Sequence, residues 1–303
     1  ELLKLENAAK EALGEDSVEV ERSSLLRRQV ARRCIYGLDI NPIAVELARV
    51  SIWIHTFVRG LPMSSLDHNL VCANSLTGIG SVDEALDVLV PGRKGQMTLF
   101  DEPIERALES ARTVLVDAAL LAEATKDESR AASRAAKKAY KDAEKARLLF
   151  DAAVLTRIGR SALVAAVEPD EIAELAAQKV AQDAIAPLNP AHMPALFPEV
   201  FLRKNPGFDV LVGNPPWEGL HVRQDEWWNR RIPGLAKLNA PAREKLIEKS
   251  RTQQPRLEEL FRFEVDAKDA QRRAVLAGPY QGLGSGHVDL YQAFAWRNWS
   301  LIR

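Results

Sequence analysis

Apolar residues in this chain follow two patterns, which predict two kinds of element. Three short apolar runs end at polar or turn residues, at positions 34–39, 69–76 and 208–212. Runs of this length bounded by turn residues are typical of buried strands. Elsewhere, apolar residues recur at three- and four-residue steps, which predicts helices. Strands alternating with helices indicate an α/β protein, here with part of a doubly wound, Rossmann-like parallel sheet.

The helix expected after the first run has clear boundary signals. Asn41 is suited to be its N-cap and Pro42 its first residue, and Gly60 closes the pattern. Asp39 therefore stands at the carboxyl end of a strand. An acidic residue at this place commonly binds the two ribose hydroxyls of a nucleoside, although it could instead help to cap the helix.

The polar tips at Asn74 and Asn214 are separated by 140 positions, far more than a crossover connection requires. Residues 105–150 are rich in alanine and charge. Their small residues at helical spacing predict an antiparallel helical hairpin that projects from the fold, and Pro169 opens a further helix. We interpret residues 99–198 as an insertion, which is either a structural arm or a docking surface for DNA or another subunit.

Composition and charge narrow the possible functions. The 303 residues include 41 Lys and Arg against 42 Asp and Glu, so contact with nucleic acid would need a local basic patch. Cys34 and Cys72 lie in apolar runs and are expected to be reduced core residues. The five histidines lack the spacing of metal ligands, so no metal site is expected. The sequence shows neither a membrane-spanning run nor a signal peptide, which favours the cytoplasm.

The third apolar run leads into the tetrapeptide Asn214-Pro215-Pro216-Trp217. Two prolines hold this turn stiff at the carboxyl end of a predicted strand, where open α/β sheets bind ligands. The Asn214 side-chain oxygen and the Pro215 carbonyl can accept hydrogen bonds from an exocyclic amino group, while Trp217 stacks on the ring that bears it. The alternative is a tight turn in which Asn214 caps its own backbone and Trp217 only packs.

At this tetrapeptide the sequence resembles the S-adenosylmethionine-dependent amino-methyltransferases that carry an Asn-Pro-Pro-aromatic motif. It looks most like the adenine-N6 DNA methyltransferases of large restriction-modification and phage-defence proteins, including the BREX and DISARM types. The resemblance extends to Tyr36-Gly37-Leu38-Asp39-Ile40-Asn41-Pro42 and to the Asp289-Leu290-Tyr291 helix. It implies a class I methyltransferase sheet, S-adenosylmethionine as cofactor and double-stranded DNA as substrate.

The resemblance also implies roles for individual residues. Asp39 would bind the ribose of the cofactor and Ile40 would lie against its adenine. Asn74, with Ser75 beside it, would bind the adenine amino group. Asn214, Pro215, Pro216 and Trp217 would be catalytic and hold the target base.

One motif of the family is missing from the sequence. Nothing between Glu1 and Arg33 supplies the strand and glycine-rich loop that wrap the methionine part of the cofactor. We therefore expect an internal fragment of a larger protein, which by itself binds S-adenosylmethionine weakly or not at all. Its parts would be residues 1–98, the cofactor side of the core; 99–198, the helical insertion; and 199–303, the catalytic part with a helical lid.

Two other functions are compatible with these motifs. The same tetrapeptide occurs in enzymes that methylate glutamine side chains of proteins, because a carboxamide also offers an amino group, and RNA is a further possible substrate. The second alternative is a catalytically inactive scaffold whose helical arm binds partners. A methylation assay on DNA and peptides separates these functions.

Three further stretches leave alternatives open. Arg27, Arg28, Arg32 and Arg33 form either a solvated helix face or a phosphate-binding face. Residues 223–231 interleave tryptophans with arginines, which suits either base stacking or the anchoring of a lid helix. The glycine-rich residues 282–286 follow no predicted strand, so a loop is favoured over a phosphate cradle.

Overall fold

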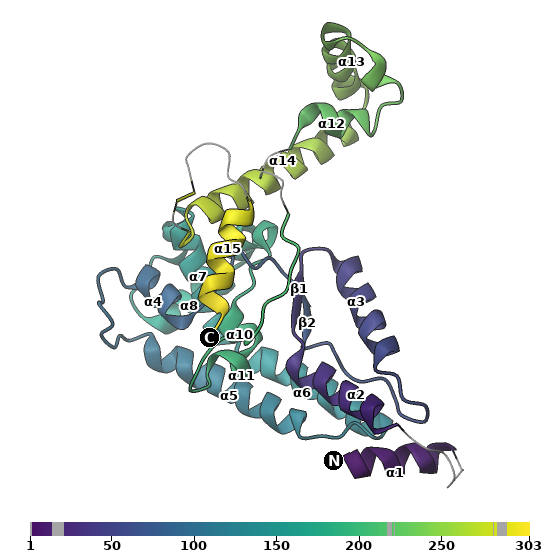
Figure 1. Ribbon diagram of the computed structural model, residues 1–303. Helices are drawn as coiled ribbons and strands as arrows, with labels where there is room; N and C mark the ends of the chain where they lie inside the picture. Colours follow the sequence, from purple (N-terminus) through teal and green to yellow (C-terminus); the bar gives the residue numbers. More distant parts are fainter. Residues whose placement is uncertain (1, 14–20, 217–219, 221, 281, 284–289) are drawn as a thin grey trace.

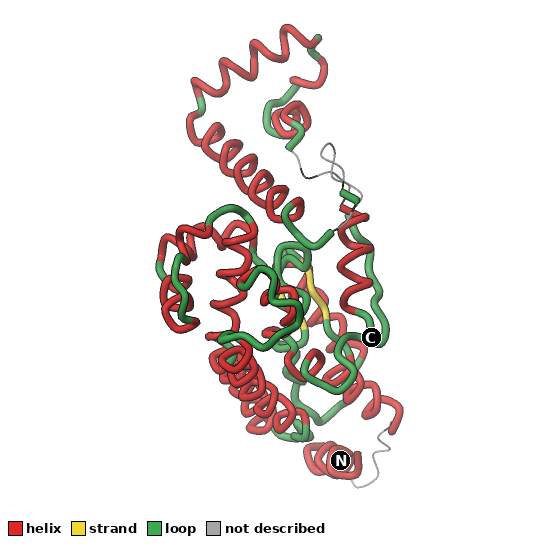
Figure 2. The backbone as a smooth tube through the Cα atoms, turned by 90° about the vertical axis from the view of Figure 1, so that its left-hand side faces the viewer, coloured by secondary structure: helices red, strands yellow, loops and turns green. Residues whose placement is uncertain are grey.

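The computed structural model describes residues 2–13, 21–216, 220, 222–280, 282–283 and 290–303. Within these residues the protein is mostly helical, and two short strands lie among the helices (Figures 1 and 2). No helix of the described residues is long and apolar enough to cross a membrane. The fold is therefore an α/β arrangement with a much smaller sheet than the sequence predicts.

The two strands, β1 (Gly37–Asp39) and β2 (Leu70–Cys72), pair in parallel with Asp39 opposite Cys72. They are joined through α3 (Pro42–His55), which begins where expected because the Asn41 side chain accepts a hydrogen bond from the Ile43 amide at 3.0 Å. Two helices precede β1, α1 (Leu2–Leu13) and α2 (Arg22–Cys34). Cys34 is the last residue of α2 and is exposed, so its prediction as a core residue is wrong.

The third predicted strand does not form a ladder. In the described part of the chain, residues 208–212 contribute only an isolated parallel bridge between Phe208 and Ile302. Val210 is 72% exposed and Val212 is 93% exposed, although both are strong strand formers. The apolar run is therefore only partly buried, with Phe208 and Leu211 packed against the core.

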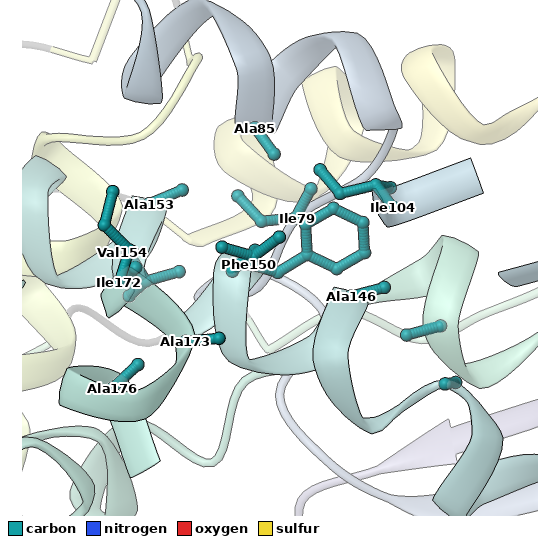
Figure 3. Packing of buried hydrophobic residues seen from close by; sticks show 14 of the residues in the cluster. Ile79, Ala85, Ile104, Ala146, Phe150, Ala153, Val154, Ile172, Ala173 and Ala176 are labelled. Atoms are coloured by element: carbon teal, nitrogen blue, oxygen red, sulfur yellow. The ribbon is translucent and has the colours of Figure 1, made fainter. Parts of the chain in front are cut away.

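Residues 99–198 contain the main hydrophobic core. The helices are α5 (Asp101–Ala119), α6 (Lys126–Asp142), α7 (Glu144–Arg157), α8 (Pro169–Ala177) and α9 (Lys179–Ile185), preceded by α4 (Val82–Leu89). The second helix of the expected hairpin is broken at Ala143 into α6 and α7. Phe150 of α7 is fully buried among Ile79, Ile104 and Ala146 (Figure 3). α7 is thus a central helix of the core and does not project from it.

Short elements connect this core to the third apolar run. They are the 3-10 helices η1 (Ser161–Val164) and η2 (Ala186–Leu188) and the short helices α10 (Met193–Leu196) and α11 (Pro198–Phe201). Pro190, in the segment between η2 and α10, makes a parallel bridge to Asn74. This segment therefore adds a short extension beside β2.

Three of the four arginines considered, Arg28, Arg32 and Arg33, have neither of the roles proposed for them, whereas Arg27 lies exposed on the helix surface. Arg32 donates to the Leu121 carbonyl at 3.0 Å, Arg28 to the Glu123 carbonyl at 3.2 Å, and Arg33 to the Ala119 carbonyl at 2.6 Å. Arg32 also makes a buried ion pair with Glu123 at 2.9 Å. Helix α5 ends at Ala119, so these cations satisfy carbonyls at and just beyond a helix C-terminus.

Residues 222–276 form an arm that extends away from the rest of the molecule (Figure 1). It contains α12 (Gln224–Asn229), the 3-10 helix η3 (Leu235–Lys237), α13 (Ala240–Gln253) and the long helix α14 (Pro255–Leu276). Trp228 is fully buried in a small separate core with Phe261 and Ile247. The last helix, α15 (Leu290–Leu301), lies against the body of the protein.

Candidate functional site

The parallel pairing of β1 and β2 brings Asp39 and Asn74 to the same end of the sheet. The Ala73 amide donates to the Asp39 carbonyl at 3.0 Å, so the chain continues the ladder up to the residue before Asn74. Ile40 follows Asp39 and is 60% exposed, and Ser75 follows Asn74 and is half-buried. The four residues expected on the cofactor side are therefore neighbours along two adjacent strand ends.

Asp39 has one local partner and remains accessible. Its Oδ1 atom accepts a hydrogen bond from the Asn41 amide at 2.7 Å, and the residue is exposed to solvent. Asp39 thus supports the turn into α3, as the structural alternative proposed. A carboxylate accepts several hydrogen bonds through its two oxygens, so this turn leaves capacity for a further donor.

The loop after β2, residues 74–80, is tightly fixed by segments that are remote in sequence. The Asn74 amide donates to the Asn189 carbonyl at 2.7 Å, and the Ala191 amide donates to the Asn74 carbonyl at 3.0 Å. Thr77 donates its hydroxyl to the Leu188 carbonyl at 2.8 Å. The Asn74 side-chain oxygen accepts from the Leu76 amide at 3.0 Å, which makes a local turn. The loop that presents Asn74 is therefore held by its own turn and by residues 188–191.

A buried histidine fixes the far end of the same loop. The Ile79 amide donates to Nδ1 of His192 at 3.2 Å, so this ring nitrogen is an acceptor and the proton of a neutral ring lies on Nε2. Nε2 then donates to Asp151 of α7 at 3.0 Å. His192 and Asp151 are both about 97% buried, and they tie the loop to the central helix.

A second set of buried residues holds the loop from α15. Arg297 is 1% exposed and donates to Glu84 at 2.7 Å and to the Gly78 carbonyl at 2.8 Å. Tyr280 donates its hydroxyl to the Leu76 carbonyl at 2.6 Å and accepts from Arg297 Nε at 3.1 Å. Sequence reasoning did not identify these residues. The spacing Ser81-x-x-Glu84 is a capping-box signal for α4, but nothing in the sequence indicates that Arg297 reaches Glu84.

The charges in this set keep each other ionised. Burial would raise the pKa of Glu84, but Arg297 and Arg157 outweigh burial and lower it. Burial would likewise lower the pKa of Arg297, but the hydrogen bond it donates to the Tyr280 hydroxyl and the Glu84 carboxylate raise it. Burial raises the pKa of Tyr280, which therefore stays a neutral hydrogen-bond donor. The set is a paired and hydrogen-bonded ion cluster, the form in which charges are tolerated in a protein interior.

The segment that leads to Asn214 makes its long-range backbone hydrogen bonds at its start. The Phe208 amide donates to the Leu301 carbonyl at 2.8 Å, and the Arg303 amide donates to the Phe208 carbonyl at 3.0 Å. The Phe208 ring also lies 5.8 Å from that of Tyr36, just before β1, and the chain then runs in the same direction as β1 (Figure 1). Asn214 is exposed, Pro215 half-buried and Pro216 exposed. Trp217 lies outside the described residues.

A cavity of about 270 Å³ lies at the other end of the strands. Tyr36 and Asn69, which precede β1 and β2, line it together with Arg32, His68 and Glu199. His68 and Glu199 are paired at 2.6 Å. Burial, together with the charge of Glu199 and a hydrogen bond to it, raises the pKa of Tyr36. None of the predicted site residues that the structure describes lines this cavity, and Asp39, Ile40 and Asn214 are exposed instead.

The other stretches considered for a functional role have structural roles where the structure describes them. Trp227 donates to Glu264 at 2.7 Å, and Arg231 stacks on the Trp227 ring at 3.6 Å. Together with the buried Trp228, these contacts show that the tryptophans anchor α12 in the arm. The glycine-rich residues 284–286 and Asp289 lie outside the described residues, whereas Leu290 begins α15 as the predicted helix requires.

Residues 33–249 match the family described as Eco57I restriction-modification methylase. The match includes both strands, the strand ends at Asp39 and Asn74 and the Asn-Pro-Pro turn. The chain belongs to the Eco57I restriction-modification methylase family. No curated protein and no solved structure matches the chain.

Membership of the Eco57I methylase family supports a methyltransferase of the restriction-modification type, which acts on DNA. The resemblance seen at Asn214 and Asp39 is thereby confirmed at this level. The matched span also includes residues 99–198 and the first half of the arm, up to residue 249, so these parts lie within the methylase region.

Proposed function

We propose that this Eco57I-family methylase transfers a methyl group from S-adenosylmethionine to N6 of an adenine that has been flipped out of double-stranded DNA. The observation that carries the proposal is the arrangement of strand ends. Asp39 and Asn74 meet at one end of the sheet, and the segment carrying Asn214 and Pro215 runs in the same direction from Phe208. Ligands of open α/β sheets bind at the carboxyl ends of the strands.

The cofactor-side residues have the chemistry that a nucleoside needs. Asp39 is exposed and keeps acceptor capacity for ribose hydroxyls, and Ile40 offers an exposed apolar side chain to an adenine ring. Asn74 would bind the adenine amino group, with Ser75 beside it. S-adenosylmethionine supplies the methyl group when it is bound. A rigid loop favours such binding because little conformational entropy is lost on association.

The catalytic turn would hold the target base. Asn214 and Pro215 accept hydrogen bonds from the exocyclic amino group, Pro216 keeps the turn stiff, and Trp217 stacks on the base. A carboxamide is no base at neutral pH, so the amino proton leaves to water after the methyl transfer. Orientation of the amino nitrogen is then the main catalytic contribution of this chain. Flipping gives the nitrogen access to the site, which it lacks inside a duplex.

The test is a transfer assay with the complete protein, methyl-labelled S-adenosylmethionine and unmethylated genomic DNA. The products are digested to nucleosides and identified by mass spectrometry. Label in N6-methyladenine is the expected result. Label in N4-methylcytosine would keep the DNA methyltransferase but overturn adenine as the target, and label only in glutamine peptides or RNA would overturn DNA. No transfer by a protein that binds both ligands would indicate a scaffold.

A further inference from the structure

Helix α15 contacts both halves of the proposed site within one helical turn. Through Arg297 it holds the loop of residues 74–80, and through the Leu301 carbonyl it holds Phe208, where the segment to Asn214 begins. Residues four apart lie on the same side of a helix. One rigid element therefore joins the loop assigned to the cofactor with the segment assigned to the target base.

The contacts of Arg297 are specific to an arginine. Its guanidinium reaches two oxygens of Glu84, the Gly78 carbonyl and the Tyr280 hydroxyl, in different directions from one planar group. Glu84 in turn accepts from the Gly80 amide at 2.8 Å and from Arg157 at 2.9 Å. A lysine carries the same charge but lacks this fork, so it cannot make all these bonds at once.

We propose that Arg297, together with Glu84 and Tyr280, is a positioning residue that sets the placement of Asn74 relative to the segment carrying Asn214. The inference rests on the proposed function, because it assumes that Asn74 binds cofactor. None of the three residues touches substrate in this assignment. They act on Leu76, Gly78 and Gly80, whose backbone fixes the course of the loop behind Asn74.

The position of the loop matters more than its mere presence. Methyl transfer requires the donor carbon and the acceptor nitrogen to approach in line, and a misplacement of about 1 Å can cost about a hundredfold in rate. The loop is also held by residues 188–192, so it should remain folded when the contacts from α15 are lost. Loss of Arg297 is therefore expected to shift the loop without unfolding it.

The molecule offers a matched control in a second buried ion pair. Arg32 and Glu123 are 2.9 Å apart with side chains 4% and 1% exposed, compared with 1% and 11% for Arg297 and Glu84. The Arg32 pair lies beside the end of α5 and the start of the strands, away from Asn74. Breaking it should lower thermal stability to a similar degree and leave cofactor binding unchanged.

The experiment compares Arg297→Lys, Arg297→Met and Tyr280→Phe with Arg32→Met in the complete protein. Cofactor affinity is measured by calorimetry with S-adenosylmethionine, DNA affinity by anisotropy, and kcat by label transfer, all well below the melting temperature. We expect Arg297→Met to weaken cofactor affinity about tenfold and to lower kcat further, since a misplaced donor also reacts more slowly. Arg297→Lys should recover only part of the loss, and DNA affinity should stay unchanged.

Other results would overturn the inference. If Arg297→Met and Arg32→Met lose equal stability and neither changes cofactor affinity or kcat, Arg297 is structural only. If Arg297→Met does not fold, Tyr280→Phe decides the matter, because it removes a single hydroxyl from the same set, and unchanged cofactor affinity and kcat there would refute the proposal. Asp39→Ala tests the proposed function separately. Unchanged cofactor affinity in that variant would show that the cofactor site itself is misassigned.

Discussion

The loop after β2 and the segment that leads to Asn214 differ in how firmly the rest of the protein holds them. The loop receives hydrogen bonds from residues 188–192 and from α15, and Leu76 to Gly80 are buried. The segment is paired at Phe208 and then becomes exposed from Asp209 to Val210 and again from Val212 to Asn214. A strand-like sequence therefore forms a strand only where a partner supplies the backbone bonds.

The difference is consistent with separate functions for the two regions at the proposed site. A fixed loop is appropriate for a cofactor that binds in one orientation. An exposed turn leaves the Asn214 amide open to a large substrate. The comparison predicts that substitutions in the loop change stability first, whereas substitutions in the turn change activity alone.

The largest effect is expected from Asn214→Ala. It removes the proposed acceptor for the amino group and should lower the methylation rate about a hundredfold, the scale for losing one hydrogen-bonding group that acts on the transition state. Because Asn214 is exposed, the free energy of unfolding should change by less than about 0.5 kcal/mol. Asn205→Ala is the control, since Asn205 is also an exposed asparagine before a proline. Normal methylation by Asn214→Ala would contradict the catalytic assignment.

The two glycines Gly78 and Gly213 test the contrast directly. A Cβ atom at Gly78 would overlap the backbone of Ala191, so Gly78→Ala should destabilise the protein by about 3 kcal/mol. A Cβ atom at Gly213 would meet nothing within 4 Å, so Gly213→Ala should be nearly neutral. Denaturant unfolding measures both variants. Equal stability of the two would show that the loop is not close-packed against residue 191.

A smaller effect is expected from Thr77→Val. The Thr77 hydroxyl is buried and donates to the Leu188 carbonyl at 2.8 Å, and a valine of the same shape would leave this carbonyl unpaired. The cost should be about 1–2 kcal/mol in unfolding free energy. Thr113→Val is the control, because the Thr113 hydroxyl is exposed and bonds only within its own helix. A loss no greater than that of the control would argue against a fixed loop.

The smallest effect concerns the pH dependence of stability at the largely buried carboxylate of Glu84 and the buried carboxylate of Glu123. The lowered pKa of Glu84 means that the unfolded chain binds more protons than the folded protein. The stability that Glu84 contributes is therefore present above about pH 4.5 and is lost as the pH falls through the folded-state pKa. Burial raises the pKa of Glu123 despite Arg32 and Arg28, so its contribution has the opposite sign and is lost as pH rises.

Unfolding curves of Glu84→Gln and Glu123→Gln, measured from pH 3 to pH 8, check these signs. The stability gap between the native protein and Glu84→Gln should widen with increasing pH. The stability gap between the native protein and Glu123→Gln should narrow with increasing pH. Parallel curves for the two variants would mean that the carboxylates have the same environment.

The sequence predicts the local parts of this fold well. The cap at Asn41, the strand ending at Asp39, a strand within residues 69–76 and the helical character of residues 105–150 all follow from periodicity and end signals. These features depend on residues close together in the chain. The roles of the individual site residues stay predictions, and the division into residues 1–98, 99–198 and 199–303 does as well.

The failures have a common physical cause, which is dependence on distant partners. The run at Phe208 has strand propensity, but propensity supplies no neighbouring strand. Arg28 and Arg32 look like a surface face because charge suggests solvent, whereas the carbonyls they satisfy belong to a helix end about 90 residues away. Arg297 shows no signal at all in the sequence, because its partners Gly78 and Glu84 are brought to it only by tertiary structure.

The long-range bonds of the loop have a consequence for the order of folding. Thr77 and Leu188 are 111 residues apart, and Glu84 and Arg297 are 213 residues apart. Contacts of such separation carry a large loop-closure entropy and form late, whereas helices α5 to α7 pack with near neighbours. We expect pulse-labelled amides of α7 to gain protection before those of Asn74 and Ala191, and the opposite order would contradict this. The loop of residues 74–80 would then acquire its shape only when the rest of the chain is already in place.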